Sequence, residues 1–118
     1  KKFPLKDVIA QTGNAAGLVT GILKSDYDLI KRSMHDLIAE PARATLIPGF
    51  YEIKKAAMEN DSIGCSISGS GPAIFAFSTS EEDADKIGIA MKKVSSKYVK
   101  KNIVYVSPIN RTGPQVIG

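Results

Sequence analysis

A run of small residues, Ser68-Gly69-Ser70-Gly71 before Pro72, is the stretch of this sequence whose composition could do chemistry. No side chain in the run is larger than a hydroxymethyl group, so its backbone N–H groups stay open to an approaching ligand. Glycine also reaches positive φ at little cost, which lets successive amides converge on one anion. A Gly-Ser-Gly turn is common in plain hairpins as well, so the run by itself fits either an anion site or a structural turn.

Three single side chains could also act on a ligand. Arg43 lies among apolar neighbours and is typical of a surface charge, unless a carboxylate or phosphate comes within reach of its planar guanidinium. His35 has no partner cluster for a metal and is typical of a solvated or hydrogen-bonded side chain. Cys65 is the only cysteine, which excludes an internal disulfide and favours a buried thiol in a reducing compartment. None of the three predicts a metal site or a catalytic group by itself.

Apolar residues at three- and four-residue spacing predict the helices around these side chains. Ser25 and Ser80 each begin a Ser-x-x-Asp sequence, which predicts a helix start. Pro41 is expected to end the second helix, because the residue before a proline disfavours the helical conformation, and residues 40–47 then form a connector. Four helices are predicted: residues 4–23, 27–38 and 48–60, and a last one with an apolar stripe from Ala84 to Tyr98.

Alternating apolar residues predict the strands. Residues 63–67 and 73–77 flank the small-residue run and form a hairpin, while 103–106 gives a third strand and 115–117 a short fourth. Separate runs of helices beside a hairpin favour an α+β fold, with helices packed on one face of a mainly antiparallel sheet.

Length and composition narrow the class of protein. A chain of 118 residues with 43% hydrophobic and 24% charged residues is typical of one globular domain. The net charge of +4 comes largely from lysines of the last helix, which lack interleaved arginine and aromatic residues and therefore favour a solvated face over a nucleic-acid surface. The sequence contains neither a signal peptide nor an apolar run of about 18 residues, which favours a cytoplasmic protein without a membrane partner. Because the first residue is Lys1, we expect a piece of a longer protein.

Taken together, the motifs resemble those of the GHMP kinases. Ile67 to Pro72, followed by an apolar strand, is similar to the third conserved motif of that superfamily. The run Ile-Ala-Glu-Pro-Ala-Arg at 38–43, then Leu-Ile-Pro-Gly-Phe at 46–50, then the small-residue run, looks like the homoserine kinase family in particular. Several separated motifs agree in order and spacing from Pro4 to the strand that ends near Ser107.

The resemblance implies a fold and a reaction. It implies that residues 1–118 form a GHMP kinase C-terminal domain of the ferredoxin-like α/β-plait type, whose ATP-binding N-terminal domain lies outside this chain. The implied reaction moves the γ-phosphoryl group of ATP to L-homoserine and gives O-phospho-L-homoserine for threonine biosynthesis. ATP and Mg²⁺ would be bound mainly by the N-terminal domain, so this half alone is expected to be inactive. A homodimer is compatible with the resemblance, and the oligomeric state stays open.

The same resemblance implies roles for individual residues. Arg43 matches the arginine that binds the substrate carboxylate. Gln11 and Asn14 stand where some members have histidines facing the active site, and this departure favours packing over a direct role. Neither a catalytic base nor a metal ligand is implied in this chain. The residues expected near the transferred phosphate are Ser68, Gly69, Ser70 and Gly71.

Two alternatives remain open. Another GHMP kinase, acting on a mevalonate-like or sugar-like alcohol, would share the fold. Arg43 separates these substrates weakly, because a mevalonate carboxylate also needs a cation, whereas the spacing of the 41–43 and 47–50 motifs favours homoserine. The second alternative is a free-standing ferredoxin-like module that binds an amino acid or RNA without catalysis, which salt-dependent RNA binding would indicate.

Overall fold

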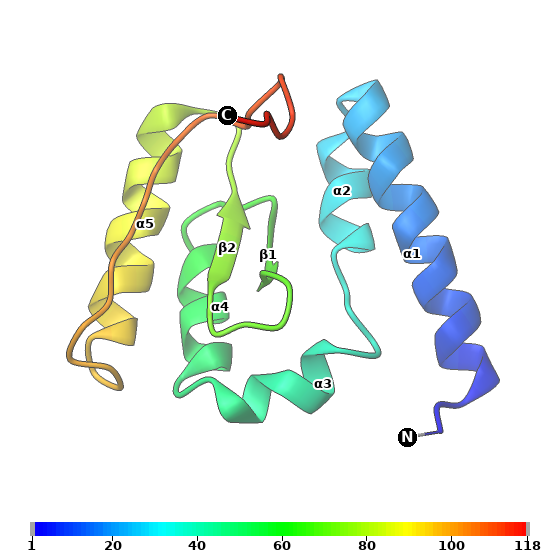
Figure 1. Cartoon of the computed structure of the whole chain (residues 1–118), viewed down its shortest axis with the longest axis horizontal. Coiled ribbons are helices and arrows are strands. Elements are labelled where there is room, and N and C mark those ends of the chain that lie inside the picture. Colours follow the sequence, from blue (N-terminus) through cyan, green and yellow to red (C-terminus); the bar gives the residue numbers. More distant parts are fainter. Residues whose placement is uncertain (1, 118) are drawn as a thin grey trace.

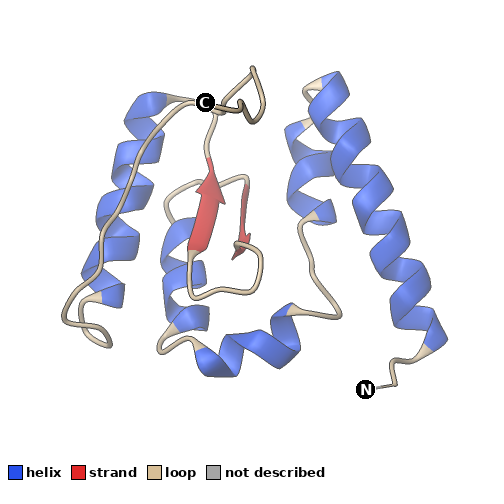
Figure 2. Ribbon diagram, viewed as in Figure 1, coloured by secondary structure: helices blue, strands red, loops and turns tan. Residues whose placement is uncertain are grey.

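A computed structural model describes residues 2–117, and its helices surround one hairpin (Figure 1). Helices α1 and α2 lie side by side on one flank, the hairpin lies with α4 and α5 on the other, and α3 lies between the two groups along one end (Figures 1 and 2). In chain order the elements are α1 (Leu5–Lys24), α2 (Tyr27–Ser33), α3 (Glu40–Arg43), the 3₁₀ turn η1 (Ala44–Leu46), α4 (Phe50–Met58), β1 (Gly64–Ile67), β2 (Ile74–Phe77) and α5 (Glu81–Ser95).

The α+β class predicted from the sequence is confirmed. Strands β1 and β2 pair antiparallel, with Gly64 opposite Phe77 and Ile67 opposite Ile74. Helices α4 and α5 pack on this hairpin through a buried cluster of Ala57, Cys65 and Ile87, one residue from each helix and one from β1. Burial of these apolar side chains is the main force that holds the two helices against the sheet.

The predicted third and fourth strands are not strands within residues 2–117, where the sheet has two strands. Segment 103–106 instead runs along α5 (Figure 1). Its Val104 packs at Gly88, where an added Cβ would lie 3.1 Å from Val104 Cγ1. The alternating pattern was therefore wrong about pairing: Val104 lies against α5, while Ile103 and Tyr105 remain 74% and 84% exposed.

Helix boundaries around residues 25–47 differ from the predicted ones. Helix α2 ends at Ser33 rather than near 38, because the Asp36 carboxylate accepts hydrogen bonds from the Ile38 and Ala39 amides and so competes with the helical pattern. The predicted connector 40–47 contains a helical turn and a 3₁₀ turn, with Pro41 in the first turn, where proline is well tolerated.

Of the two predicted helix caps, the one at Ser25 is wrong and the one at Ser80 is confirmed. Asp26, not Ser25, caps α2 by accepting from the Leu29 amide at 2.9 Å, while Ser25 ends α1 in the left-handed conformation. The cap at Ser80 is confirmed: its hydroxyl accepts from the Asp83 amide at 3.1 Å. A shift of one residue is enough to move a cap, because neighbouring serine and aspartate can both fill the position.

Helix α1 packs on α2 at two glycines but leaves its apolar stripe open. An added Cβ would lie 2.9 Å from Ile30 at Gly21 and would overlap the Ser33 hydroxyl at Gly17. Leu5 and Leu23, which belong to the apolar face of this predicted helix, are 73% and 81% exposed. The helical period of this segment was thus predicted correctly, but this chain supplies little to cover its apolar face. Among residues 2–117, no helix is both long enough and apolar enough to cross a membrane.

We predict that the Cys65 thiol reacts slowly in the folded protein. Burial raises its pKa from 9.0 to about 11, an effect that the positive charge of Lys54 partly offsets and the negative charge of Glu40 reinforces. At pH 9 about half of the unfolded thiols are ionised against about 1% of the folded ones, so alkylation of Cys65 by iodoacetamide should be at least ~50-fold slower before denaturation. Mass spectrometry of the Cys65 peptide measures both rates, and equal rates would show that the thiol is not buried.

The same shift makes the stability depend on pH. Between pH 9 and about 11 the unfolded thiol loses its proton before the folded one, so the contribution of Cys65 to the free energy of unfolding falls as the pH rises through this range.

Candidate functional site

The small-residue run forms a tight turn between β1 and β2. The Gly71 amide donates to the Ser68 carbonyl at 3.0 Å, and the Ser68 amide donates to the Ala73 carbonyl at 2.8 Å. Gly69 has φ 58° and Gly71 φ 78°, in the left-handed region that favours glycine. Two of the run's amides are therefore used by the turn itself, while those of Gly69 and Ser70 donate to no other residue between 2 and 117.

Arg43 is brought to this turn from a distant part of the sequence. It is the last residue of α3, and its Nη1 donates to the Ser70 carbonyl at 3.2 Å across 27 residues. The guanidinium has five N–H donors, so most remain for a ligand. None of the carboxylates described in residues 2–117 forms an ion pair with Arg43. The exposed guanidinium and the two amides together suit a carboxylate or a phosphate.

A largely buried ion pair connects the elements that carry this site, and it was not predicted from the sequence. Lys54 Nζ donates to both carboxylate oxygens of Glu40, at 2.7 and 2.8 Å. The Ser66 hydroxyl donates to Glu40 Oε2 at 3.4 Å, so α3, α4 and β1 meet at one carboxylate. The available signal was a carboxylate beside Pro41 with an amphipathic helix following it, and this signal does not indicate which lysine pairs with the carboxylate.

Gln11 and Asn14 bind the backbone after α2 in this structure. Gln11 Oε1 accepts from the Leu37 amide at 2.9 Å, and Asn14 Nδ2 donates to the His35 carbonyl at 2.8 Å. These bonds hold the irregular segment that follows α2 against α1. Both amides are thus engaged with the backbone of segment 35–37, whereas Arg43 and the turn are brought together with each other.

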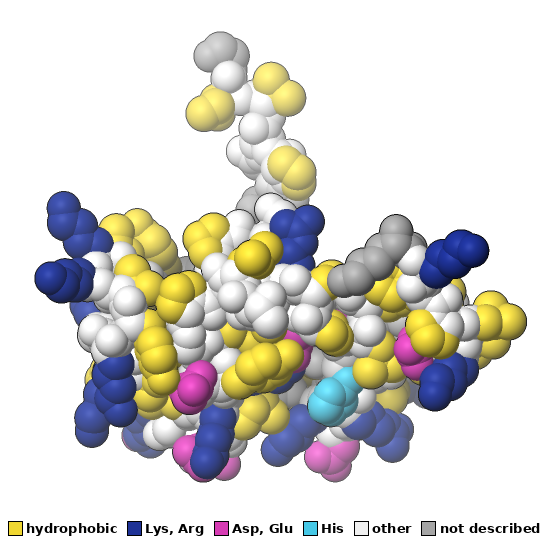
Figure 3. All heavy atoms as spheres, turned by 90° about the horizontal axis from the view of Figure 1, so that it is seen from below, with side chains coloured by type: hydrophobic (Ala, Val, Ile, Leu, Met, Phe, Trp, Pro, Cys, Tyr) yellow, Lys and Arg dark blue, Asp and Glu magenta, His cyan; other side chains and the backbone are white. Residues whose placement is uncertain are grey.

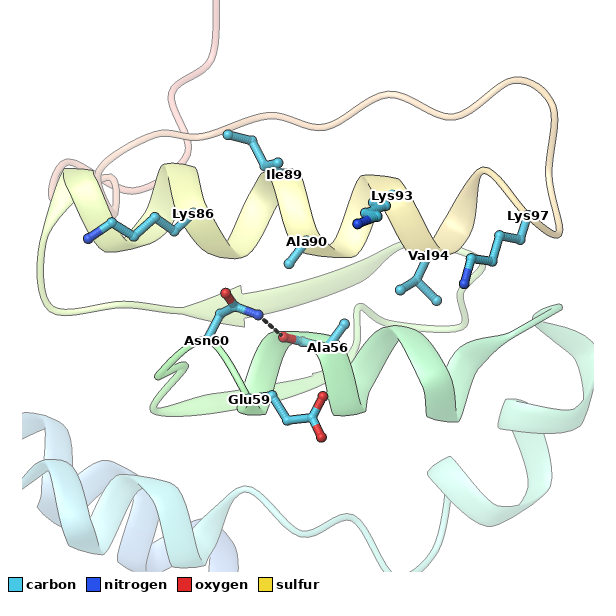
Figure 4. A pocket seen from close by; sticks show the side chains of 9 residues that line it. All are labelled: Ala56, Glu59, Asn60, Lys86, Ile89, Ala90, Lys93, Val94 and Lys97. Atoms are coloured by element: carbon cyan, nitrogen blue, oxygen red, sulfur yellow. Dashed lines mark hydrogen bonds between the residues drawn. The ribbon is translucent and has the colours of Figure 1, made fainter.

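A hollow lined by both charged and apolar side chains lies away from this site. Figure 4 shows this hollow between α4 and α5, whose lining includes Lys86, Lys93 and Lys97 but neither Arg43 nor any residue of the turn. Lys86 there is paired with Glu82 at 2.8 Å. Lysine and arginine side chains are spread around the outline of the face shown in Figure 3 rather than gathered in one patch. These features are typical of a solvated, positively charged surface.

Comparisons with known proteins find relatives of this chain. A family model described as "GHMP kinases C terminal" matches residues 18–97. The chain is 51% identical to a protein named homoserine kinase from Chlorobium phaeobacteroides (strain BS1), over 99% of this chain and 37% of that protein. It is 52% identical to another of that name from Chlorobium phaeovibrioides, over 96% of this chain and 36% of that protein.

A solved structure agrees in fold as well as in sequence. The crystal structure of homoserine kinase from Cytophaga hutchinsonii matches with a TM-score of 0.87 and 55% identity, covering 99% of this chain and 37% of that one. The chain therefore spans about 37% of the length of the relatives it matches. Because the family model covers more than half of the residues, this chain belongs to the GHMP kinase family and corresponds to its C-terminal domain.

Proposed function

We propose that residues 1–118 are the substrate-binding, C-terminal domain of a homoserine kinase. The whole enzyme would transfer the γ-phosphoryl group of ATP to L-homoserine, giving O-phospho-L-homoserine in cytoplasmic threonine biosynthesis. The observation that carries this proposal is 45–52% identity to proteins named homoserine kinase over 96–99% of the chain. The N-terminal domain of the same protein would complete the site from the other side.

In the proposed reaction this chain positions the acceptor. Arg43 would bind the homoserine carboxylate, and the free amides of Gly69 and Ser70 would face the phosphoryl group. The homoserine hydroxyl oxygen forms a bond to the γ-phosphorus, the bond from that phosphorus to the ADP oxygen breaks, and the hydroxyl proton is released. Catalysis of phosphoryl transfer depends mostly on alignment and charge, so we assign no base to this chain.

ATP and Mg²⁺ belong to the proposal for the whole enzyme. Between residues 2 and 117, no three His, Cys, Asp or Glu side chains come together as a metal site. The donors at the candidate site are cationic or N–H groups, which bind anions rather than Mg²⁺. We therefore assign no Mg²⁺ ligand to this chain and derive no step from the metal.

The proposal is tested by measuring ADP release from the full-length protein with Mg-ATP. We expect a strong preference for L-homoserine over mevalonate and galactose, and no turnover by residues 1–118 alone. Turnover of another alcohol would reassign the substrate within the same family. Turnover of none, with salt-dependent RNA binding instead, would support a non-catalytic module.

We predict that Arg43→Ala raises KM for L-homoserine by about one to two decades. A hydrogen bond to a charged group contributes roughly 1.5–3 kcal/mol, which corresponds to that change. Arg43→Lys should recover only part of the loss, because lysine keeps the charge but not the paired donors. Arg32→Ala, which removes an exposed arginine of α2, is the matched control and should leave KM unchanged. Unaltered KM in Arg43→Ala would contradict the assignment.

We predict that Gly69→Ala lowers kcat/KM whereas Gly113→Ala does not. Both glycines have positive φ, 58° and 67°, and neither has an atom within 4 Å of an added Cβ, so the two changes impose similar backbone strain. At Gly69 the methyl group would point into the space where the proposal puts the ligand. Gly71 is a poorer choice, because its added Cβ would lie 3.0 Å from Ile47 and disturb folding.

Steady-state kinetics compare the two variants, and their melting temperatures are measured first to show that both are folded to the same extent. Equal activity in both would make the turn purely structural.

A further inference from the structure

The Glu40–Lys54 pair takes no part in the proposed chemistry, yet it joins the elements that carry the site. The side chains of Lys54 and Glu40 are only 18% and 10% exposed, and their closest N–O distance is 2.7 Å. Through Ser66 the pair also contacts β1, the strand that leads directly into the turn. One ion pair therefore reaches both halves of the candidate site.

Helix α3, which carries Arg43, is too short to fix its own orientation. It has four residues, and a helix of one turn is unstable in water without outside contacts. Its outside contacts are side chains: Glu40 binds Lys54, and Ala44 directly after the helix is buried against Ile47 and Phe50. Arg43 follows Glu40 by three residues, so the two side chains are neighbours on the surface of the turn.

Lys54, the other member of the pair, belongs to the well-packed helix α4. Ile53 and Ala57 of α4 are buried, and Phe50 of the same helix lies in the cluster beside α3. A buried ion pair contributes little to stability compared with apolar side chains of similar size, and its best-attested use is to select one arrangement. The arrangement that this pair selects is the place of α3 relative to α4 and β1.

We propose that Glu40 and Lys54 are positioning residues for Arg43, holding α3 where the guanidinium reaches both the Ser70 carbonyl and a substrate carboxylate. This inference rests on the proposed function. Without Lys54, the Glu40 carboxylate would be left buried and unpaired one turn away from Arg43, the cation that α3 itself provides. The guanidinium would then be drawn toward Glu40 and away from the substrate.

The test uses the full-length kinase and separates KM from kcat. Lys54→Met should raise KM for L-homoserine about tenfold, because misplacement of a binding group by about 1 Å can cost up to about two decades. KM for ATP should change by less than about twofold. Lys55→Met is the matched control, since Lys55 is its neighbour on α4, is 73% exposed and lies 3.7 Å from Glu59. A purely structural role would lower kcat and the melting temperature while leaving KM for homoserine unchanged, and that result would overturn the proposal.

A double-mutant cycle shows whether Lys54 acts through Arg43. In the Arg43→Ala background, Lys54→Met should add no further rise in KM, and an additive rise would contradict the proposal. Should Lys54→Met fail to fold, Lys54→Arg and Glu40→Gln replace it. Lys54→Arg should keep KM for L-homoserine close to the wild-type value, and Glu40→Gln should raise it.

The proposed function and the proposed role of Lys54 can fail separately. Absence of homoserine turnover by the wild type would overturn the proposed function together with this inference. A raised KM in Arg43→Ala with an unchanged one in Lys54→Met and Glu40→Gln would overturn this inference alone.

Discussion

A carboxylate taken out of water needs a cation, and in this domain that requirement falls on Glu40 and is met by Lys54. The pair acts together with an apolar cluster in which Ala44, Ile47 and Phe50 are buried and Ile67 and Ile74, the residues next to the turn, pack against them. Charge and apolar burial thus converge on the same end of the molecule. In the proposal the position of Arg43 depends on both, together with its own hydrogen bond to the Ser70 carbonyl, because a helix of four residues does not fix its orientation alone.

In the proposal, the site assembled in this way is one side of a binding site. A single guanidinium and two backbone amides can hold an anion, but between residues 2 and 117 they lie on an open turn. The relatives are nearly three times as long as this chain, and their remaining length is where the proposal puts the nucleotide. Division of labour of this kind suits phosphoryl transfer, in which alignment of two substrates contributes much of the rate enhancement.

Local patterns predicted the hairpin, α4 and α5 well, because alternation, helical spacing and the cap at Ser80 act over a few residues. Local patterns failed where groups far away in the sequence determine the conformation of a segment. The place of segment 35–37 against α1 depends on Gln11 and Asn14, which lie more than twenty residues away from the backbone they bind. An alternating segment at 103–106 cannot specify whether a strand or α5 will cover it, and the stripe of α1 cannot specify what lies against it.

For the site, the motifs named candidate residues but did not predict how these residues meet. Arg43 was expected to bind the substrate carboxylate and the turn to lie near the transferred phosphate. The hydrogen bond between Arg43 and Ser70 spans 27 residues, which no periodicity links. Lys54 falls within the predicted helix 48–60, whose helical spacing does not indicate a partner for it. Its pairing with Glu40 depends on the packing of α4 against α3 and β1, which only the three-dimensional structure supplies.

Whether Arg43 binds the substrate carboxylate is tested by removing that carboxylate from the substrate instead of the arginine from the protein. The kcat/KM values of the full-length kinase for L-homoserine and for L-homoserine amide would be determined in the wild type and in Arg43→Ala. If Arg43 binds the substrate carboxylate, the wild type prefers the acid by about one to two decades and Arg43→Ala shows almost no preference. The same preference in both proteins would show that another group binds the carboxylate and would contradict the account.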